Sequence, residues 1–365
     1  MNKKLGIVID DDFSSKHIPP FPKPSFNSFE NPLRLKCVIE YFNKKKIFHD
    51  DRVIKLEPKS INEDILRLGH SQYHIESVNR LSKMGGGLID EEVFITGDTY
   101  ELAKKAVGGV IQAIESVLEK QVNQTFAIIR PPGHHAYRER ASGLCIFNNI
   151  ATAILYLRNR LNYKKKIAII DIDNHFGDGL AQYFYEDPTI LYFSIHEYDF
   201  SQADLGFIDE LGHGEGIGKN INFPVPEGII DEDFYIFFDL MDIVLNEFKP
   251  DLIIVAAGFD MYFADPIGNC LLTSKSYYKF AEKILQISEK VCEGRIVFAL
   301  EGGYSLIGLP YCIHAIIKAL LKDKYELADF EKENLFKKSK REEIFKIGKA
   351  LKTLLSNYWE NVNPE

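Results

Sequence analysis

The sequence predicts an α/β protein with a mainly parallel sheet covered by helices on both faces, and three observations support this fold class. Short apolar segments rich in β-branched residues alternate with longer segments of helical periodicity. The apolar segments are nearly uninterrupted, as in parallel strands buried on both faces. Chemically active side chains directly follow several of these segments, as expected at the carboxyl edge of a parallel sheet.

The predicted elements follow this alternation along the chain. A short apolar strand lies near the N-terminus, and the clearest strands cover residues 126–130, 166–173, 189–196, 252–258 and 295–303. Helical patterns are clearest at residues 148–161, 231–248 and 274–291. At 365 residues the chain is long for one domain, but no repeat or low-complexity linker divides it. We therefore expect one domain, with a peripheral lysine-rich helical segment near the C-terminus whose charged face is solvated.

Composition and charge exclude several classes of protein. A formal net charge of −9 and a pI near 5.7 argue against direct nucleic-acid binding, which needs a basic surface, but allow cationic substrates. We expect no membrane contact and no secretory signal, and hence a cytoplasmic protein, because no apolar run reaches the length of a membrane span. The five cysteines lack CxxC pairing, which favours free buried thiols over disulfides or a cysteine zinc site.

The segment "IIDIDNHFGDG", residues 169–179, begins as a buried strand and ends as a glycine-rich turn. Asp171, Asp173 and His175 are spaced two residues apart, so in an extended chain they project from one side. Taken alone, the pattern is also compatible with a capped turn. A row of two carboxylates and one imidazole at the end of an apolar strand nevertheless indicates the edge of a metal site.

Other predicted strands end in the same kind of chemistry. Residues 126–130 lead into "PPGHHAYRERASG" with His134 and His135, residues 252–258 precede Asp260, and residues 295–303 precede Tyr304. Each of these motifs alone is more often a polar loop or a tight turn. Their repetition at successive strand ends of one α/β chain favours a functional site.

These segments together resemble the ordered motifs of the zinc-dependent histone deacetylase family, nearer its class II and prokaryotic members. The matching segments are "RPPGHHA" (130–136), "ASGLCIFNNIA" (141–151), "DIDNHFGDG" (171–179), "SIH" (194–196), "AAGFD" (256–260), "DPIG" (265–268) and "EGGY" (301–304). The resemblance implies a single domain around an eight-stranded, mainly parallel sheet, the arginase-deacetylase fold. It implies a catalytic domain over residues 1–321, with residues 322–365 as a C-terminal helical extension packed on it or peripheral to it.

The resemblance also implies a metal site. Asp173, His175 and Asp260 match the family's zinc ligands and leave a coordination position for water and the substrate carbonyl. Zinc is the metal expected, one per chain, although this ligand set also accepts Fe(II), Co(II) or Mn(II). A potassium ion is expected beside it, held by oxygens of residues that are mostly main-chain ligands: Asp171, Asp173, His175, Ser194 and Ile195.

The catalytic residues implied by the resemblance form two histidine–carboxylate pairs and a tyrosine: His134 with Asp171, His135 with Asp178, and Tyr304. A carboxylate that binds one imidazole nitrogen fixes the tautomer and raises the basicity of the ring. We expect His135 to be the general base and later the acid, and Tyr304 to donate to the oxyanion. Arg34 matches a family arginine near the inner end of the pocket, or else forms an ordinary surface ion pair.

Several positions depart from the family pattern. Phe176 replaces a second histidine, and Asn174 replaces an apolar or aromatic residue. The substrate tunnel is expected to be lined by Gly143, Leu144 and Ile267, with Leu144 in place of a common phenylalanine. Because one aromatic side chain is missing from the tunnel wall, we expect acyl groups longer than acetyl to be tolerated. The opposite wall is expected from Phe200 or Phe207, between which the sequence does not decide.

The expected substrate is an acylated lysine in a protein or peptide, and acetylated polyamine is the alternative. Ile267 of "DPIG" favours lysine, because polyamine-directed relatives carry an acidic residue at this position; Asp90 or Glu92 could still supply a carboxylate. An arginase-like ureohydrolase would need a second metal with more aspartates. A non-catalytic acyl-binding module would more often have lost one of the catalytic residues. The sequence leaves the oligomeric state open.

Overall fold

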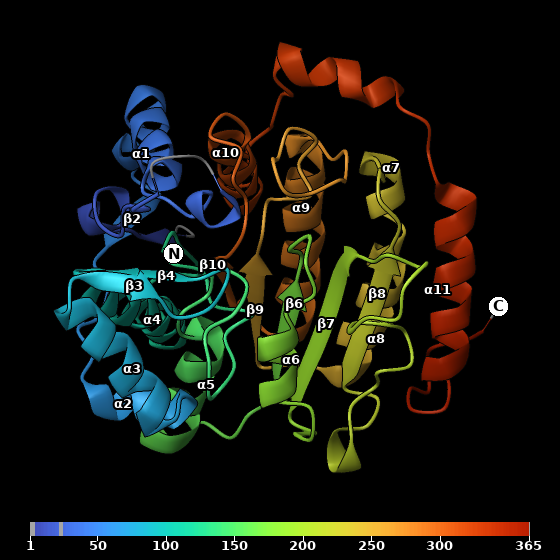
Figure 1. Ribbon diagram of the computed structural model, residues 1–365. Helices are drawn as coiled ribbons and strands as arrows, with labels where there is room; N and C mark the ends of the chain where they lie inside the picture. Colours follow the sequence, from blue (N-terminus) through green and yellow to red (C-terminus); the bar gives the residue numbers. More distant parts are fainter. Residues whose placement is uncertain (1–3, 22–24, 365) are drawn as a thin grey trace. The chain divides into compact units, whose positions relative to one another are not determined.

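The computed structural model describes residues 4–21 and 25–364 and shows an α/β protein (Figure 1). Eight strands form the main sheet in the order β2-β1-β5-β10-β9-β6-β7-β8, and β3 and β4 form a small antiparallel hairpin. The strands are β1 Leu5–Val8, β2 Val53–Leu56, β3 Gly86–Leu88, β4 Phe94–Thr96, β5 Gln124–Ala127, β6 Ile167–Asp171, β7 Ile190–Glu197, β8 Asn220–Val225, β9 Leu252–Ala257 and β10 Ile296–Leu300. The α-helices are α1 Leu33–Lys45, α2 Glu63–Gly69, α3 Gln72–Lys83, α4 Thr99–Leu118, α5 Asn149–Arg160, α6 Asp178–Tyr183, α7 Asp231–Phe234, α8 Phe237–Phe248, α9 Ser274–Val291, α10 Gly308–Leu320 and α11 Arg341–Leu355.

The chain consists of two compact units. Unit 1 comprises Met1–Lys164, Gly177–Tyr183 and Val297–Leu306. Unit 2 comprises Lys165–Phe176, Phe184–Ile296 and Ile307–Glu365. None of the helices in the described part of the chain is long and apolar enough to cross a membrane.

Unit 1 is built around β1, whose four residues are all buried. β1 pairs in parallel with β2 and with β5, so that Leu5 is opposite both Val53 and Gln124. The long helix α4 packs on β1 and β5 through an apolar face, which is expected for a helix that covers a parallel sheet. The carboxyl end of β5 leads into the loop that carries His134 and His135.

Unit 2 is built around β6, whose five residues are also all buried. β6 pairs in parallel with β7 and β9, and β7 pairs in parallel with β8. Asp171 is the last residue of β6 and lies opposite Ser194 of β7 and Ala256 of β9. The carboxyl ends of these three strands therefore carry the segments with the predicted metal ligands.

Each strand and helix that the sequence predicts clearly has a counterpart in the structure, but three differences stand out. β5 ends at Ala127, so the strand predicted at 126–130 overlaps it only at its first two residues. The helix predicted at 274–291 is α9 with the same bounds. The helix predicted at 231–248 is interrupted, because Ile236 and Phe238 donate to carbonyls three residues earlier, Asp233 and Tyr235, and tighten the turn between α7 and α8. Strand β8, at the edge of the sheet, was not among the clear strands of the sequence, since it contains Pro224 and two asparagines.

Residues beyond 321 belong to unit 2 and pack on its other elements. Ile344, Leu351 and Leu355 of α11 are buried, and this helix contacts β8, α7 and α8 (Figure 1). Trp359 is buried and its indole N–H donates to the carbonyl of Gly218 at 2.8 Å. The charged residues at the start of α11 are exposed, as the charge run predicted.

Candidate functional site

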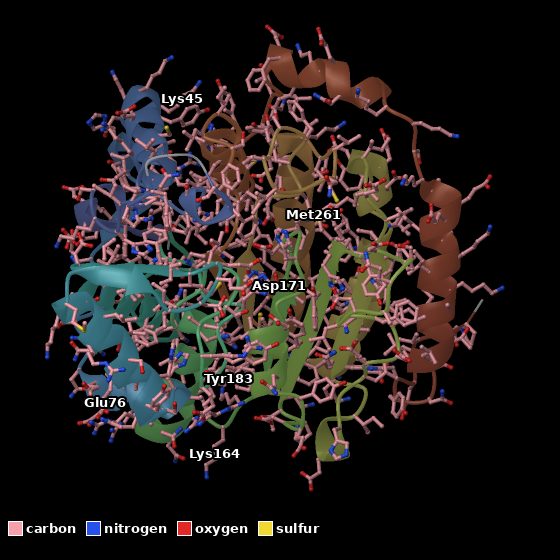
Figure 2. The ribbon with its side chains drawn as sticks, viewed as in Figure 1. Lys45, Glu76, Lys164, Asp171, Tyr183 and Met261 are labelled. Atoms are coloured by element: carbon pink, nitrogen blue, oxygen red, sulfur yellow. The ribbon has the colours of Figure 1, made fainter. Side chains whose placement is uncertain are left out.

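Asp171, which is labelled in Figure 2, is the last residue of β6, and hydrogen bonds around it hold the end of this strand. Tyr192 donates its hydroxyl to Oδ2 of Asp171 at 2.9 Å, and the N–H of Asp173 donates to Oδ1 at 3.1 Å. The carboxylate thus caps the turn that follows the strand. This is the capped turn that the sequence pattern alone also allowed. The same turn places Asp173 and His175 at the carboxyl edge of unit 2.

Asp173, His175 and Asp260 come together in unit 2 and form a candidate metal site. Nδ1 of His175 is 3.3 Å from Oδ1 of Asp173 and 3.1 Å from Oδ2 of Asp260. The other oxygen of Asp260 accepts the N–H of Asn174 at 2.8 Å, which fixes the carboxylate from the adjacent segment. Gly258 makes this approach possible, because a Cβ at that position would lie 2.1 Å from Oδ2 of Asp173.

The electrostatics of this group fit a divalent cation. Burial and the charge of Asp173 raise the pKa of Asp260 to about 6. Although burial alone would lower the pKa of His175, its hydrogen bonds to Asp173 and Asp260 raise that pKa well above the usual range. Two buried carboxylates on one imidazole leave negative charge to be compensated.

The distances between the nitrogen and oxygen atoms of this group also fit a bound divalent ion. Atoms that bind a tetrahedral zinc at about 2.0–2.2 Å stand roughly 3.3–3.6 Å apart. The nitrogen–oxygen separations in the structure, 3.3 and 3.1 Å, are close to that spacing. The His175 side chain is 36% exposed whereas the two carboxylates are 1% exposed, so a bound ion would keep an open side.

His135 and Asp178 form the second arrangement, in unit 1. Nδ1 of His135 donates to Oδ1 of Asp178 at 2.7 Å, and Tyr137 donates its hydroxyl to Oδ2 at 2.5 Å. Burial would raise the pKa of Asp178, but the hydrogen bonds from His135 and Tyr137 hold it below its usual value. The carboxylate therefore stays ionised and keeps the Nε2 lone pair of His135 available as a base. Tyr137 was not predicted from the sequence.

The loop before α5 packs directly on this imidazole. Gly143 has φ +50° and Leu144 has φ +65°, and Ser142 and Cys145 pair on either side of them. A Cβ on Gly143 would lie 2.4 Å from Cδ2 of His135, so only glycine allows the loop this close. The predicted tunnel residue Gly143 thus lies beside His135, and Leu144 is buried.

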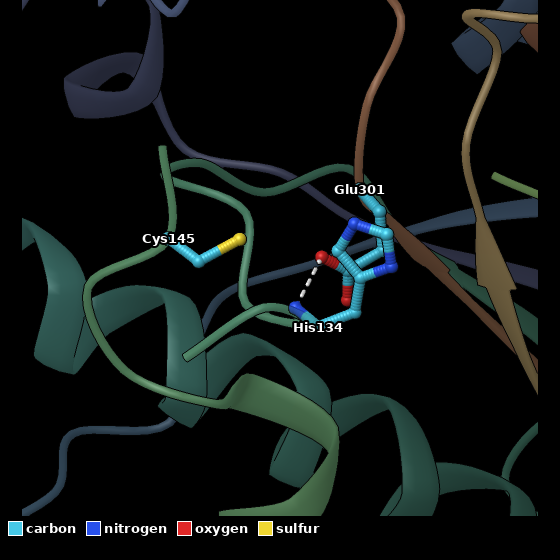
Figure 3. A group of neighbouring side chains, drawn as sticks. All are labelled: His134, Cys145 and Glu301. Atoms are coloured by element: carbon cyan, nitrogen blue, oxygen red, sulfur yellow. Dashed lines mark hydrogen bonds between the residues drawn. The ribbon is translucent and has the colours of Figure 1, made fainter. Parts of the chain in front are cut away.

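His134 is buried next to His135, with ring centroids 4.1 Å apart. Its side chain lies near those of Cys145 and Glu301 (Figure 3). Glu301 accepts the N–H groups of Gly133 at 2.6 Å and His134 at 3.1 Å through Oε2. The pairing of His134 with Asp171 stays a prediction, because the two residues belong to different units.

Tyr304 follows β10 and is buried beside Arg34. The guanidinium carbon of Arg34 lies 4.5 Å from the centroid of the Tyr304 ring. Arg34 donates to the carbonyls of Gly303 at 2.8 Å and Glu301 at 2.6 Å. It is fully buried, which excludes the alternative that it forms a surface ion pair.

A buried carboxylate supports this arginine. Glu30 accepts from Arg34 at 3.1 Å and from Arg130 at 2.6 Å. Burial would raise the pKa of Glu30, but the charge of Arg130 and its hydrogen bond lower it to about 2. The backbone leading to Tyr304 is therefore held by a buried network of ionised side chains.

The remaining predicted residues lie in unit 2. Ser194 is 2.8 Å from His196 through Oγ and Nδ1, and Ile195 is the next residue of β7. Phe176 contacts the His196 ring at 5.0 Å. Ile267 is half-buried, and its N–H donates to Asp265 at 3.1 Å. The rings of Phe200 and Phe207 both lie beside the Tyr198 ring, with centroid separations of 5.2 and 5.4 Å.

The chain is similar to known deacetylases over most of its length. The sequence pattern of the histone deacetylase domain matches residues 28–320. A probable deacetylase of Archaeoglobus fulgidus is 36% identical over 319 residues, 86% of this chain and 86% of that protein. Histone deacetylase 18 of Arabidopsis thaliana is 32% identical over 379 residues, 99% of this chain but 53% of the plant protein. Polyamine deacetylase HDAC10 of Danio rerio is 33% identical over 280 residues, 73% of this chain and 40% of that protein.

The structural comparison gives the same fold. The crystal structure of the HDA15 HD domain superposes with a TM-score of 0.84 at 24% identity, covering 99% of this chain and 97% of that chain. The predicted α/β fold with an eight-stranded central sheet is confirmed. The chain belongs to the histone deacetylase family. It is therefore a deacetylase, an enzyme that hydrolyses amides.

Proposed function

We propose that this protein is a zinc-dependent deacylase that removes acetyl or other acyl groups from lysine side chains. The observation that carries the metal dependence is the group of Asp173, His175 and Asp260, with nitrogen–oxygen separations of 3.3 and 3.1 Å. Its charge and spacing fit a divalent ion, and two carboxylates with one imidazole are a ligand set that zinc accepts. Membership of the histone deacetylase family supports the same proposal.

A zinc ion held there would polarise the amide carbonyl and make the attacking water more acidic. His135 takes the proton of that water at Nε2, because its Nδ1–H is engaged by Asp178. The same imidazole then returns the proton to the leaving amine. Tyr304 donates its hydroxyl to the oxyanion that develops on the carbonyl. His134, with Asp171 as its proposed partner, supports the charge of His135.

A potassium ion is proposed for the backbone oxygens around the end of β6. The register that places Asp171 opposite Ser194 supports it, because it brings the last residue of β6 beside the backbone of the neighbouring parallel strand β7. The five cysteines form no disulfide, which supports a reducing compartment such as the cytoplasm.

Replacement of one metal ligand tests the proposal. We expect Asp260→Ala to lose bound zinc and amide hydrolysis together, because three protein ligands leave little redundancy. Elemental analysis of the purified protein, which also counts potassium, is compared with turnover of an acetyl-lysine peptide. Asp209→Ala, an exposed carboxylate of the same unit, serves as the matched control and should keep both. An Asp260→Ala protein with one zinc per chain and normal turnover would refute the site.

Lysine is the proposed substrate rather than polyamine, and Ile267 is the residue that supports it. The resemblance implies an acidic residue at this position in the polyamine-directed members of the family, whereas an aliphatic side chain offers no partner for a second ammonium group. A cation left partly desolvated and unpaired loses binding free energy. The similarity to a polyamine deacetylase of Danio rerio makes acetylated polyamine the second candidate.

The two substrates are separated by comparing kcat/KM for an acetyl-lysine peptide, N-acetylputrescine and N8-acetylspermidine. We expect the parent enzyme to prefer the peptide and Ile267→Glu to shift toward the polyamines. Ile267→Leu, which keeps the apolar character, should behave as the parent. A parent that prefers polyamines would overturn the substrate assignment. An Ile267→Glu enzyme without any shift would show that this position does not select the substrate.

A further inference from the structure

A second group of metal-binding side chains lies in unit 1: His134, Cys145 and Glu301 (Figure 3). The three residues are 3%, 0% and 1% exposed. They offer an imidazole nitrogen, a sulfur and a carboxylate oxygen that all lie within 4.8 Å of one another. They come from three separate segments, the loop after β5, the loop before α5 and the end of β10.

We propose that His134, Cys145 and Glu301 form a second, thiolate-containing site for zinc, and that zinc bound there withdraws His134 from catalysis. The inhibitory part rests on the proposed function, in which His134 supports the general base. The metal site itself does not depend on that function.

The ligand set selects the kind of metal. Thiolate and imidazole together favour zinc or another borderline ion over magnesium, calcium or manganese, which prefer oxygen. Zinc binds sulfur at about 2.3 Å, and its nitrogen and oxygen ligands at about 2.0–2.2 Å. Ligand atoms around it stand roughly 3.3–3.7 Å apart, so the group needs side-chain movements of about 1 Å to close. The candidate site in unit 2 has no sulfur, which makes the two sites chemically distinguishable.

The backbone orients two of the three ligands. Oε2 of Glu301 accepts the N–H groups of Gly133 and His134, so Oε1 is the oxygen assigned to the metal. The positive φ angles of Gly143 and Leu144 form a tight turn that is closed on both sides by hydrogen bonds between Ser142 and Cys145, at 2.8 and 3.1 Å. Leu144 is strained in this conformation, which a leucine adopts only where the surroundings hold it. The turn thereby fixes the position of the Cys145 backbone.

Occupancy of this site would have a specific consequence. An imidazole nitrogen of His134 that binds zinc is no longer able to accept a proton. Zinc in excess of the first equivalent should therefore slow the enzyme in a saturable way. Because the thiol must lose its proton to bind, the second equivalent should bind more tightly as pH rises.

Cobalt and zinc spectroscopy test the site directly. A second equivalent of Co(II), added to protein that already holds one, should produce the near-ultraviolet absorption of a thiolate–Co(II) bond. X-ray absorption of the two-zinc protein should show sulfur at about 2.3 Å. Both signals should be lost in Cys145→Ser and Cys145→Ala and kept in Cys292→Ala, a buried thiol of unit 2. Absence of a sulfur signal in the parent, or its survival in both Cys145 variants, would overturn the proposed site.

The activity measurement separates this proposal from the proposed function. Each protein is compared with its own one-zinc rate, and the zinc concentration for half-inhibition should rise at least about 10-fold in Cys145→Ser. A sulfur signal without inhibition of the parent would support the metal site and overturn its inhibitory role, and with it the role of His134. Inhibition that is equal in parent and Cys145→Ser would show that excess zinc acts elsewhere. Loss of the sulfur signal alone leaves the Asp260→Ala test of the main function unaffected.

Discussion

Arg34 shows how individual buried residues of unit 1 support the chemistry proposed for Tyr304. The arginine binds the carbonyls of Glu301 and Gly303 and lies against the Tyr304 ring. Its charge is compensated by Glu30, so the arrangement does not depend on a solvent-exposed ion pair. A hydroxyl held by a rigid backbone is suited to stabilise a developing oxyanion, because no reorganisation is needed at the moment of reaction.

The change of Tyr304 to phenylalanine tests this role. It deletes one hydrogen-bond donor and leaves the ring and its contact with Arg34 in place. We expect turnover to fall by about 10²-fold or more, as for loss of one oxyanion donor elsewhere. Zinc content should be unchanged, since Tyr304 is not among the candidate ligands. A tyrosine that serves only in packing would leave turnover within a few-fold of the parent, and that result would contradict the mechanism.

The sequence predicted some site residues by physical spacing and others only by resemblance. The alternation of Asp171, Asp173 and His175 along an extended strand is visible in the sequence, and the structure places the last two with Asp260. Glu301 and Cys145 could not be predicted as partners of His134. They are far apart in the chain, and an isolated glutamate or cysteine has no spacing signal. Tyr137 was missed for the same reason, since many loop tyrosines merely pack.

Among the elements, the one least predictable from the sequence is the segment around Glu331. This residue lies in the 3₁₀ helix Asp329–Phe336, inside a charged stretch, yet it is fully buried. It accepts from the N–H of Ser274 at 2.9 Å and from the Ser274 hydroxyl at 2.8 Å, at the first residue of α9. A run of charged residues indicates that most of its side chains are exposed, but it does not show which one of them is buried. The strands, by contrast, were predictable because burial on both faces makes them apolar throughout.

Glu331→Ala should destabilise the protein. The change leaves the N–H and hydroxyl of buried Ser274 without this acceptor, which costs about 1–3 kcal/mol of unfolding free energy. Burial raises the pKa of Glu331, so its charge is not the source of the stability. Glu331→Gln keeps an acceptor oxygen and should retain most of the stability. Urea unfolding of both variants is compared with Glu333→Ala, an exposed neighbour. Equal midpoints for Glu331→Ala and Glu333→Ala would refute the capping role.

At the scale of the whole molecule, the resemblance carried by the ordered motifs predicted the complete sheet, whereas the pattern of apolar residues predicted only part of it. Five strands were clear from apolar runs, whereas β2 and β8 carry polar residues because they lie at the two ends of the strand order. Edge strands are bonded on one side only, and their sequences are accordingly mixed. The number of strands therefore came from the resemblance, and the eight-stranded sheet of the structure confirms it.

Buried histidines in both units set the pH dependence of stability. Burial lowers the pKa of His17 in unit 1 to about 3 and that of His196 in unit 2 to about 4. Nε2 of His196 donates to the carbonyl of Gly206 at 2.9 Å, and Nδ1 is 2.8 Å from the hydroxyl of Ser194. Because a carbonyl only accepts, Nε2 carries the proton and Nδ1 must accept from Ser194. A second proton on Nδ1 would end the donation from Ser194 and would place a positive charge on a fully buried ring.

The sign of the effect follows from these lowered pKa values. An unfolded histidine titrates near pH 6.5, whereas these side chains stay neutral in the folded protein down to about pH 4. Below pH 6.5 the unfolded chain binds more protons, so stability is complete above that pH and is lost as pH falls toward 4. Each such histidine contributes a slope of up to about 1.4 kcal/mol per pH unit.

Urea unfolding of the zinc-loaded protein between pH 7 and 5 measures the slope of unfolding free energy against pH. We expect His196→Asn to reduce the mean slope over this range by about 0.7 proton, or roughly 0.9 kcal/mol per pH unit. His213→Asn, at an exposed ion pair with Glu186, should leave it nearly unchanged. Identical slopes for the parent and His196→Asn would show that His196 is not held neutral in the folded protein.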